Sequence, residues 1–298
     1  MTLRRPLLWF APLVVACGDP IDLEAPGSEV VQTVAVEAGT TLRPVKLDCR
    51  SPGTSDNPLV LFGHGFLIPP TQYDSYAQHL ATHGFLACTV DFVTGLTPNH
   101  ALWATDYRAA IDALILADAD PASPLFGKLD PERIGLAGHS LGGKLAVLAA
   151  KEDPRVKAVF GVDPVDGQEP DATALLPLSI PLGVIGETID ATANGMACAP
   201  AEANYTTFFE AAAAPALEIT ALGANHLSFL DDRSSCELVC EFCNPATVPD
   251  AEVNALTRAY LVAFFGRYLA DRDYDSQLNG DEAKRRYVET RRITIRSR

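Results

Sequence analysis

The stretch Arg133-Ile-Gly-Leu-Ala-Gly-His-Ser-Leu-Gly-Gly-Lys144 decides how this chain is expected to fold. An apolar run leads into Gly-His-Ser140-Leu-Gly, and the Ala- and Leu-rich residues 141–151 that follow have the character of a helix. A Gly-x-Ser-x-Gly sequence between a strand and a helix is typical of a sharp turn that presents a nucleophilic serine. The glycines let neighbouring backbone approach closely, and the helix N-terminus favours negative charge that develops beside the serine. We therefore predict that Ser140 is a nucleophile.

Apolar runs and helical stretches alternate on both sides of this turn. The expected strands are residues 30–36, 42–48, 58–63, 85–92, 133–138, 156–162, 182–185 and 217–222, and the expected helices are 73–83, 101–117, 141–151, 205–213 and 253–269. Short, continuously apolar strands that alternate with helices indicate a mostly parallel sheet with helices on both faces. The predicted fold class is α/β, with one domain over residues 30–274.

A serine hydroxyl needs a neighbouring base, because its own proton leaves too reluctantly near neutral pH. In proteins with this type of turn the histidine comes last in chain order. Of the six histidines, only His226 lies downstream of Ser140, just after the extended run 217–222. We predict that His226 is the base, whereas His64 in the loop after residues 58–63 is expected to have a structural role.

The acid that orients this histidine should lie between the serine and the histidine in the chain. Asp163 directly follows the expected strand 156–162, and Glu187 and Asp190 follow the next expected strand. Position along the chain does not decide between Asp163 and the pair Glu187 and Asp190 as the acid. Asp166 is a weaker candidate, because it lies farther from its strand end.

An oxyanion that forms at a substrate carbonyl needs two backbone N–H donors. The amide of Leu141, next to the serine, is predicted to be one. The second should come from the loop His64-Gly-Phe66 after residues 58–63, where the glycine allows a tight turn and the Phe66 amide is the expected donor. This chemistry implies no metal ion and no organic cofactor.

Composition narrows the functional classes. The chain has 298 residues and a net charge of −15, with 48% hydrophobic and 20% charged residues. The apolar fraction excludes a disordered chain, and the acidity argues against nucleic acid as a partner. No apolar run reaches the length of a membrane span. Residues 284–298 hold seven Lys or Arg and one acid, so residues 275–298 are expected to form a loosely held basic tail, with pairing to the acidic body or to an anionic surface as the alternative.

Residues 1–17 resemble a bacterial export signal that ends in a lipoprotein cleavage motif. Two arginines precede a short apolar core, which ends in Leu-Val-Val-Ala-Cys17. This pattern predicts cleavage before Cys17 and attachment of lipid to its thiol, with residues 18–29 as a tether. The alternatives are ordinary signal cleavage near Ala16 and a buried cysteine. The expected location is the bacterial cell envelope, where the lipid on Cys17 anchors the protein to a membrane.

Six cysteines remain after Cys17, and an even number in an exported chain predicts disulfide bonds. Cys236, Cys240 and Cys243 are crowded into one segment. A single Cys-x-x-Cys without a second pair and without nearby histidines is a poor zinc site, so disulfides that staple loops are favoured. For Cys88, which lies in an apolar run, a buried free thiol is the alternative.

These residues resemble the chlorophyllase-like branch of the α/β-hydrolases. The resemblance rests on blocks between residues 58 and 245, namely 59–66, 76–85, 138–144, 161–167, 198–200, 225–232 and the cysteine cluster at 236–243. The acid of that family belongs to its Asp-Pro-Val sequence, here Asp163-Pro-Val, so the resemblance favours Asp163. The platelet-activating-factor acetylhydrolases are also similar, whereas cutinase-like polyester hydrolases share the serine turn but place the acid after the next strand.

The resemblance implies an α/β-hydrolase fold and a serine hydrolase that cleaves carboxylic esters through an acyl-enzyme intermediate. Leu141 stands where the plant enzymes usually carry Arg, and the leader is bacterial in style, so chlorophyll as the substrate does not follow. The expected partner is a small-molecule or lipid-like ester. The alternatives are a non-catalytic binding lipoprotein on the same fold, and an amidase or peptidase.

Overall fold

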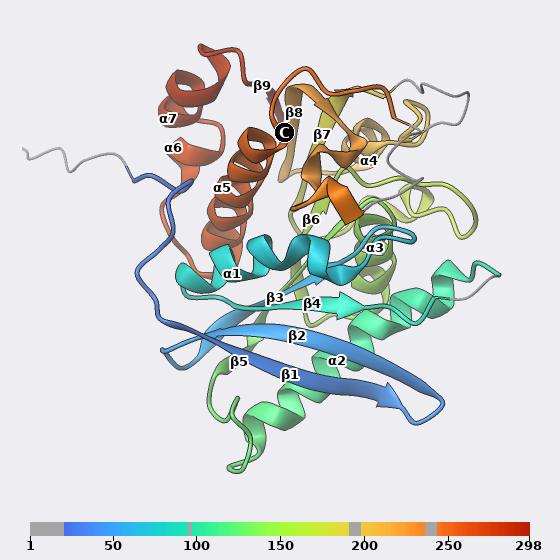
Figure 1. Cartoon of the computed structure of the whole chain (residues 1–298), viewed down its shortest axis with the longest axis vertical. Helices are drawn as coiled ribbons and strands as arrows, with labels where there is room; N and C mark the ends of the chain where they lie inside the picture. Colours follow the sequence, from blue (N-terminus) through green and yellow to red (C-terminus); the bar gives the residue numbers. More distant parts are fainter. Residues whose placement is uncertain (1–20, 95–96, 191–197, 236–242) are drawn as a thin grey trace, which may run out of the picture.

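Nine strands form one sheet in the computed structural model, which describes residues 21–94, 97–190, 198–235 and 243–298 (Figure 1). The strands are β1 (Val31–Thr40), β2 (Arg43–Pro52), β3 (Asn57–Gly63), β4 (Leu86–Asp91), β5 (Leu129–His139), β6 (Val156–Val162), β7 (Leu182–Ile189), β8 (Ala216–Asn225) and β9 (Ile293–Ser297). Their order in the sheet is β1-β2-β4-β3-β5-β6-β7-β8-β9. The pairs from β4 to β8 are parallel, and the outer pairs β1–β2, β2–β4 and β8–β9 are antiparallel. The prediction of a mostly parallel sheet is confirmed.

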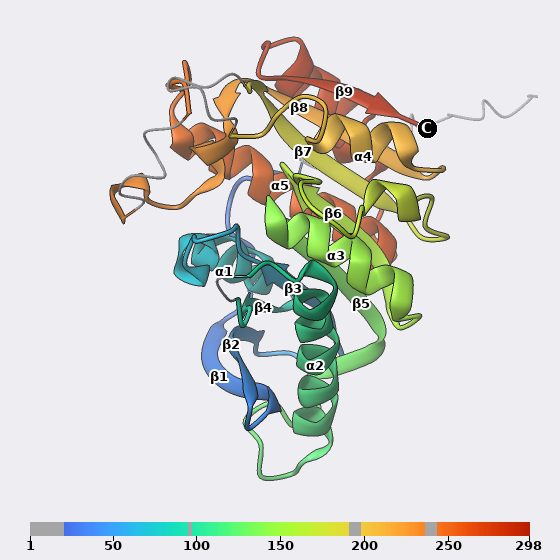
Figure 2. The ribbon, with the colours of Figure 1, turned by 90° about the vertical axis from the view of Figure 1, so that its right-hand side faces the viewer.

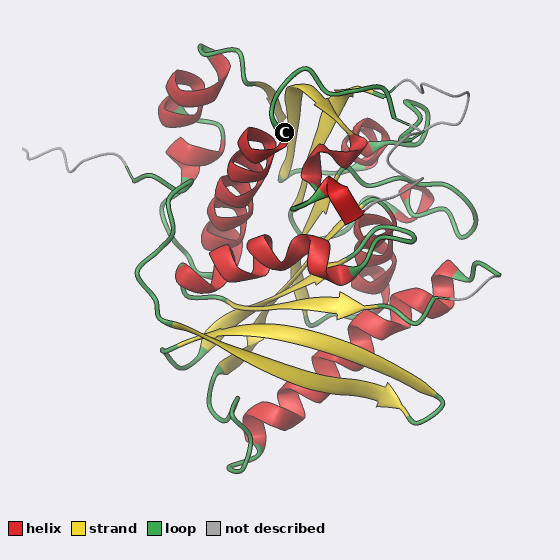
Figure 3. Ribbon diagram, viewed as in Figure 1, coloured by secondary structure: helices red, strands yellow, loops and turns green. Residues whose placement is uncertain are grey.

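Helices cover both faces of the sheet, as predicted (Figures 2 and 3). Helices α1 (Asp74–Thr82) and α5 (Asp250–Leu269) contribute Tyr76 and Phe264 to the core on one face. Helices α2 (His100–Ala119), α3 (Leu141–Glu152) and α4 (Tyr205–Ala211) contribute Tyr107, Leu145 and Phe208 to the core on the other face. In the described part of the chain, no helix combines the length and the apolar character needed to cross a membrane.

The C-terminal residues are ordered parts of the domain, which corrects the expectation of a loose basic tail over residues 275–298. They form α6 (Asp275–Leu278), α7 (Asp281–Ala283), a short π-helix (Lys284–Val288) and β9. Ile293 is buried, and Arg296 forms an ion pair with the buried Glu218 of β8. The basic side chains pair with acidic groups of the body. The high charge of this segment, taken alone, indicates a solvated tail and not a strand.

Residues 21–29 lie against the domain and do not form a free tether. Leu23 is only 3% exposed, in the same core cluster as Tyr287. The carboxylate of Glu24 accepts a hydrogen bond of 2.8 Å from Arg292. The polar composition of this segment predicts a hydrated tether. Instead, Leu23 is buried in the same core cluster as Tyr287, and Glu24 pairs with Arg292 of the basic C-terminal segment. The predicted leader, including Cys17, lies outside the described residues.

Two disulfide bonds link segments far apart in sequence, Cys49 to Cys88 and Cys198 to Cys243. Cys88 is therefore not a free thiol; antiparallel pairing of β2 with β4 places it directly opposite Cys49. The remaining predicted disulfide partners, Cys236 and Cys240, lie outside the described residues. Disulfides are typical of proteins in oxidising compartments, which agrees with the prediction of export.

Replacing both Cys49 and Cys88 with alanine should lower the free energy of unfolding by roughly 2–4 kcal/mol, because the bond constrains the unfolded chain. The two residues are 39 positions apart in sequence. Urea unfolding followed by circular dichroism measures the change. The pair joins β2 to β4, away from the turn between β5 and α3, so activity per folded molecule should be retained. Unchanged stability of the double variant would contradict this prediction.

Candidate active site

Ser140 lies at the turn between β5 and α3, in a backbone conformation that residues other than glycine rarely adopt. Its φ angle is 53°, and its N–H donates to the Val162 carbonyl at 3.0 Å. A Cβ atom on Gly138 would lie 2.4 Å from the carbonyl carbon of Gly142, so the turn requires glycine. The strained turn fixes the serine hydroxyl at the carboxyl ends of the parallel strands, as the local sequence pattern predicts.

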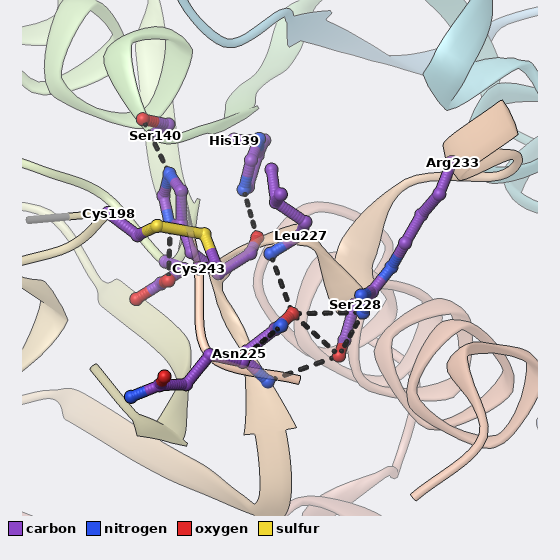
Figure 4. The surroundings of a disulfide bond; sticks show 11 residues. His139, Ser140, Cys198, Asn225, Leu227, Ser228, Arg233 and Cys243 are labelled. Atoms are coloured by element: carbon purple, nitrogen blue, oxygen red, sulfur yellow. Dashed lines mark hydrogen bonds and ion pairs between the residues drawn. A yellow bond between two sulfur atoms is a disulfide. The ribbon is translucent and has the colours of Figure 1, made fainter. Parts of the chain in front are cut away.

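His226 directly follows β8 and opens a 3-10 helix (His226–Phe229). Asn225 caps this helix, because its side chain accepts from the Leu227 N–H while Ser228 Oγ accepts from the Asn225 N–H (Figure 4). The cap fixes the start of the segment that carries the imidazole. His226 Nε2 lies 3.0 Å from Ser140 Oγ. The serine hydroxyl donates in this pair when Nε2 carries no proton.

Asp163 directly follows β6 and lies on the other side of the imidazole. Its Oδ2 is 2.5 Å from His226 Nδ1, and the side chain is fully buried. The φ angle of Asp163 is 44°, and its N–H donates to the Ile185 carbonyl at 2.6 Å. A proton on Nδ1 that is donated to this carboxylate leaves Nε2 free to accept the proton of Ser140. The structure thus brings these three predicted residues into one chain of hydrogen bonds.

The other candidate acids have different surroundings. Asp166 pairs with the buried ammonium of Lys144 at 3.1 Å. Glu187, near the end of β7, makes no hydrogen bond to His226 in the described part of the chain, although it is buried nearby. Among the described residues, Asp163, Glu187 and His226 are the one group of three or more His, Cys, Asp or Glu in which one ligand-type atom from each residue lies within 4.8 Å of those of the others. Both ring nitrogens of His226 in this group already have protein partners.

Burial shifts the titration of all three groups. Burial raises the pKa of Asp163 to about 7. Burial, together with the charge of Asp163, raises the pKa of Glu187 well above its ordinary value. Burial lowers the pKa of His226, so that its imidazole is neutral and able to accept a proton at neutral pH.

A second chain of hydrogen bonds lies behind the serine, and the sequence analysis did not identify it. The Gly65 N–H donates to the Tyr73 hydroxyl at 3.2 Å, and this hydroxyl lies 2.7 Å from His139 Nδ1. His139 Nε2 lies 2.9 Å from the His226 carbonyl oxygen, an acceptor, so Nε2 carries the proton and Nδ1 accepts from tyrosine. Burial lowers the pKa of His139 well below its ordinary value, which keeps this ring neutral. The chain connects the loop after β3 to the backbone of His226.

The loop after β3 lies against the serine turn, where the second oxyanion donor was predicted. A Cβ atom on Gly142 would lie 2.2 Å from the Gly63 carbonyl oxygen, so the two backbones touch. This contact brings the segment that carries Phe66 next to the helix start at Leu141. His64 hydrogen-bonds to backbone groups of its own loop and of the segment after β4, which agrees with its predicted structural role.

A serine on a strained strand-to-helix turn, with a buried histidine and acid at the ends of later strands, is the arrangement of the α/β-hydrolases. A sequence model of the chlorophyllase family matches residues 25–288, and the chain belongs to this family. Chlorophyllase-1 of Arabidopsis thaliana is 28% identical over 228 residues, which is 70% of this chain and 69% of the relative.

Two further relatives extend this comparison. Chlorophyllase-2 of Arabidopsis thaliana is 28% identical over 197 residues, which is 59% of this chain and 62% of the relative. Cutinase 2 of Thermobifida cellulosilytica is 31% identical over 87 residues, which is 29% of this chain and 32% of the relative. Similarity to both groups supports a serine ester hydrolase.

Proposed function

We propose that the protein cleaves carboxylic esters through an acyl-enzyme intermediate. The observation that carries this proposal is the hydrogen-bonded series in which Ser140 Oγ lies 3.0 Å from His226 Nε2, and His226 Nδ1 lies 2.5 Å from Asp163. Ser140 attacks the ester carbonyl while His226 takes its proton, and the Phe66 and Leu141 amides stabilise the oxyanion. His226 then protonates the leaving alcohol, and water releases the acid by the same steps.

The side chains near the proposed oxyanion hole favour an apolar, uncharged ester. Phe66, whose amide is the proposed donor, and its neighbour Leu67 are large apolar residues with exposed fractions of 46% and 69%. The Phe66 ring stacks on Trp103 with centroids 6.4 Å apart. Exposed apolar groups that cluster beside a site are typical of a surface that binds apolar partners. We infer that the substrate is a small-molecule or lipid-like ester with an apolar portion.

A panel of esters tests this function. The panel should run from short acyl esters to long-chain lipids and chlorophyll, with matched amides beside the short esters. We expect kcat/KM to rise with the apolar length of the substrate, and esters to be cleaved faster than their matched amides. Failure to cleave any ester would overturn the proposal, and faster cleavage of the amides would favour an amidase.

We also propose that the protein is exported and held at the bacterial cell envelope by lipid on Cys17. The support is the sequence of the leader and the two disulfide bonds of the domain. Growth with a labelled fatty acid tests this, because the label should appear on the wild-type protein and be absent from a Cys17→Ala variant.

A further inference from the structure

Two buried carboxyl groups lie next to each other beside the imidazole of His226. Asp163 is 0% exposed and Glu187 is 3% exposed. One carboxyl oxygen of each lies within 4.8 Å of the other and of a ring nitrogen of His226. Among the described residues, no N–H or O–H group donates to Asp163 Oδ1 or to either carboxyl oxygen of Glu187. Three buried acceptor atoms therefore lack a donor, which is costly in a folded protein.

A single proton resolves this problem. Two adjacent carboxylates in a buried site repel each other, and each loses its hydration. A proton on one carboxyl removes one negative charge and supplies an O–H donor for the other carboxylate. The hydrogen bond that forms between the two groups gives a partner to one oxygen of each.

The surroundings place this proton on Glu187. Asp163 Oδ2 lies 2.5 Å from His226 Nδ1, and a carboxylate stabilises the imidazolium that forms during proton transfer. Burial raises the pKa of both acids, and for Glu187 the neighbouring charge of Asp163 raises the pKa further. Asp163 therefore carries the single negative charge of the pair.

The other groups that face Glu187 do not replace the proton. Tyr205 of α4 donates its hydroxyl to the backbone carbonyl of Glu187 at 3.1 Å and so leaves the carboxyl group without a donor. Asp190, close by on the chain, adds negative charge and raises the pKa of Asp163. His226 already donates to Asp163, and no Lys or Arg of the described chain forms an ion pair with Glu187.

We propose that Glu187 is a positioning residue whose protonated carboxyl donates a hydrogen bond to Asp163 Oδ1. This bond holds the carboxylate of Asp163 so that Oδ2 faces His226 Nδ1. It also stabilises the ionised form of Asp163 without adding a second charge to the site. The inference rests on the proposed function, because it assigns a role in positioning the same acid and base.

The first test compares Glu187→Leu with Glu187→Gln. Leucine removes the donor and is expected to lower kcat about tenfold with little change in KM, the size of one hydrogen bond to a charged group. It should also move the acid limb of the kcat/KM profile to higher pH, because the ionised form of Asp163 loses stabilisation. Glutamine is neutral and still offers an N–H donor, so it should restore most of the lost kcat and return the acid limb to its wild-type position.

Asp190→Asn is the matched control for charge. It removes a negative charge near Asp163 and takes away no hydrogen-bond donor, so the acid limb should move to lower pH without a loss of kcat. A glutamine variant as slow as the leucine variant would overturn the proposal. A shift of the glutamine acid limb to lower pH by about one unit or more would also overturn it, because Glu187 would then be charged in the wild type.

Infrared difference spectroscopy tests the proton directly and needs no substrate. The carbonyl stretch of a protonated, buried carboxyl should be present in the wild-type protein and absent from Glu187→Gln. Absence of this band from a wild-type protein whose activity depends on Ser140 would overturn the role of Glu187 alone. Ester hydrolysis that persists in Ser140→Ala would instead overturn the proposed function, and the band would still report the protonation of Glu187. If the leucine variant fails to fold, the glutamine variant and the infrared band decide.

Discussion

Replacing Ser140 with alanine should lower kcat for ester hydrolysis by about 10⁶-fold, the size of effect that loss of a catalytic serine has in serine hydrolases. Alanine leaves the acid, the base and the oxyanion donors in place but removes the atom that forms the acyl-enzyme. The KM should change little, because the hydroxyl contributes mainly to the transition state. Hydrolysis of a short chromogenic ester under saturating conditions measures this loss.

Covalent labelling provides a second measurement of the same prediction. A fluorophosphonate probe should label the wild-type protein at Ser140, and peptide mass spectrometry should find no label in the alanine variant. Ser55→Ala, in an exposed loop, is the matched control and should behave as the wild type. Full esterase activity in Ser140→Ala would refute the assignment, whereas a wild-type Ser140 that resists the probe would favour a binding protein without activity.

Replacing Asp163 with asparagine should lower kcat by about 10⁴-fold, with the fold intact. The amide presents an N–H to His226 Nδ1, so the imidazole proton moves to Nε2. A protonated Nε2 cannot accept the proton of Ser140 from its position 3.0 Å away. Steady-state kinetics measure the loss, and a thermal melt verifies that the variant is folded.

The same measurement on Glu187→Gln decides between the two acids. Under the assignment to Asp163, Asp163→Asn is about 10⁴-fold slower than wild type, and Glu187→Gln retains most of its activity. Activity near that of the wild type in Asp163→Asn, together with a large loss in Glu187→Gln, would assign the acid to Glu187. This comparison is informative because the two carboxyl groups are neighbours in the fold, while they are separated by one strand in the sequence.

Local sequence and chain order were enough to identify the serine and the histidine. Ser140 lies between an apolar strand and a helix, and glycine is required on both sides of it, because a Cβ atom added to Gly142 or Gly138 would lie only 2.2 or 2.4 Å from a backbone atom. His226 is the one histidine after the serine, and it follows the strand that the apolar run 217–222 predicts. These signals depend on neighbours in the chain, which is why the sequence carries them.

The choice between Asp163 and Glu187 depends on distances that the sequence does not contain. Both acids lie at the carboxyl end of a parallel strand, so strand order places them side by side without saying which one reaches the imidazole. The role of His139 was missed for a similar reason. Its partners, Tyr73 and the His226 carbonyl, lie 66 and 87 positions away in the sequence.

The C-terminal strand was missed because its composition is polar. Ile293 and Ile295 alternate with polar residues, as in a strand. With only two apolar residues the alternating pattern is short, and the arginines around it indicate a polar tail instead. Arg296 is stabilised in this strand because it forms an ion pair with Glu218, the residue opposite it on β8. Glu24 and Arg292 form another ion pair. Such pairs explain why the acidic segment 21–29 and the basic C-terminal segment are both ordered.

The position of β9 at the edge of the sheet also affects how copies of this protein meet. Residues Leu217–Ala221 of β8 pair with β9, and without it their backbone N–H and C=O groups would form an open edge. An open, regular edge is a template on which a strand from another molecule can add, the route by which sheets aggregate. The final strand β9 occupies that template, and its one arginine, Arg296, holds it there through ion pairs with Glu210 and Glu218. It thereby keeps neighbouring molecules off the strand that leads directly into His226.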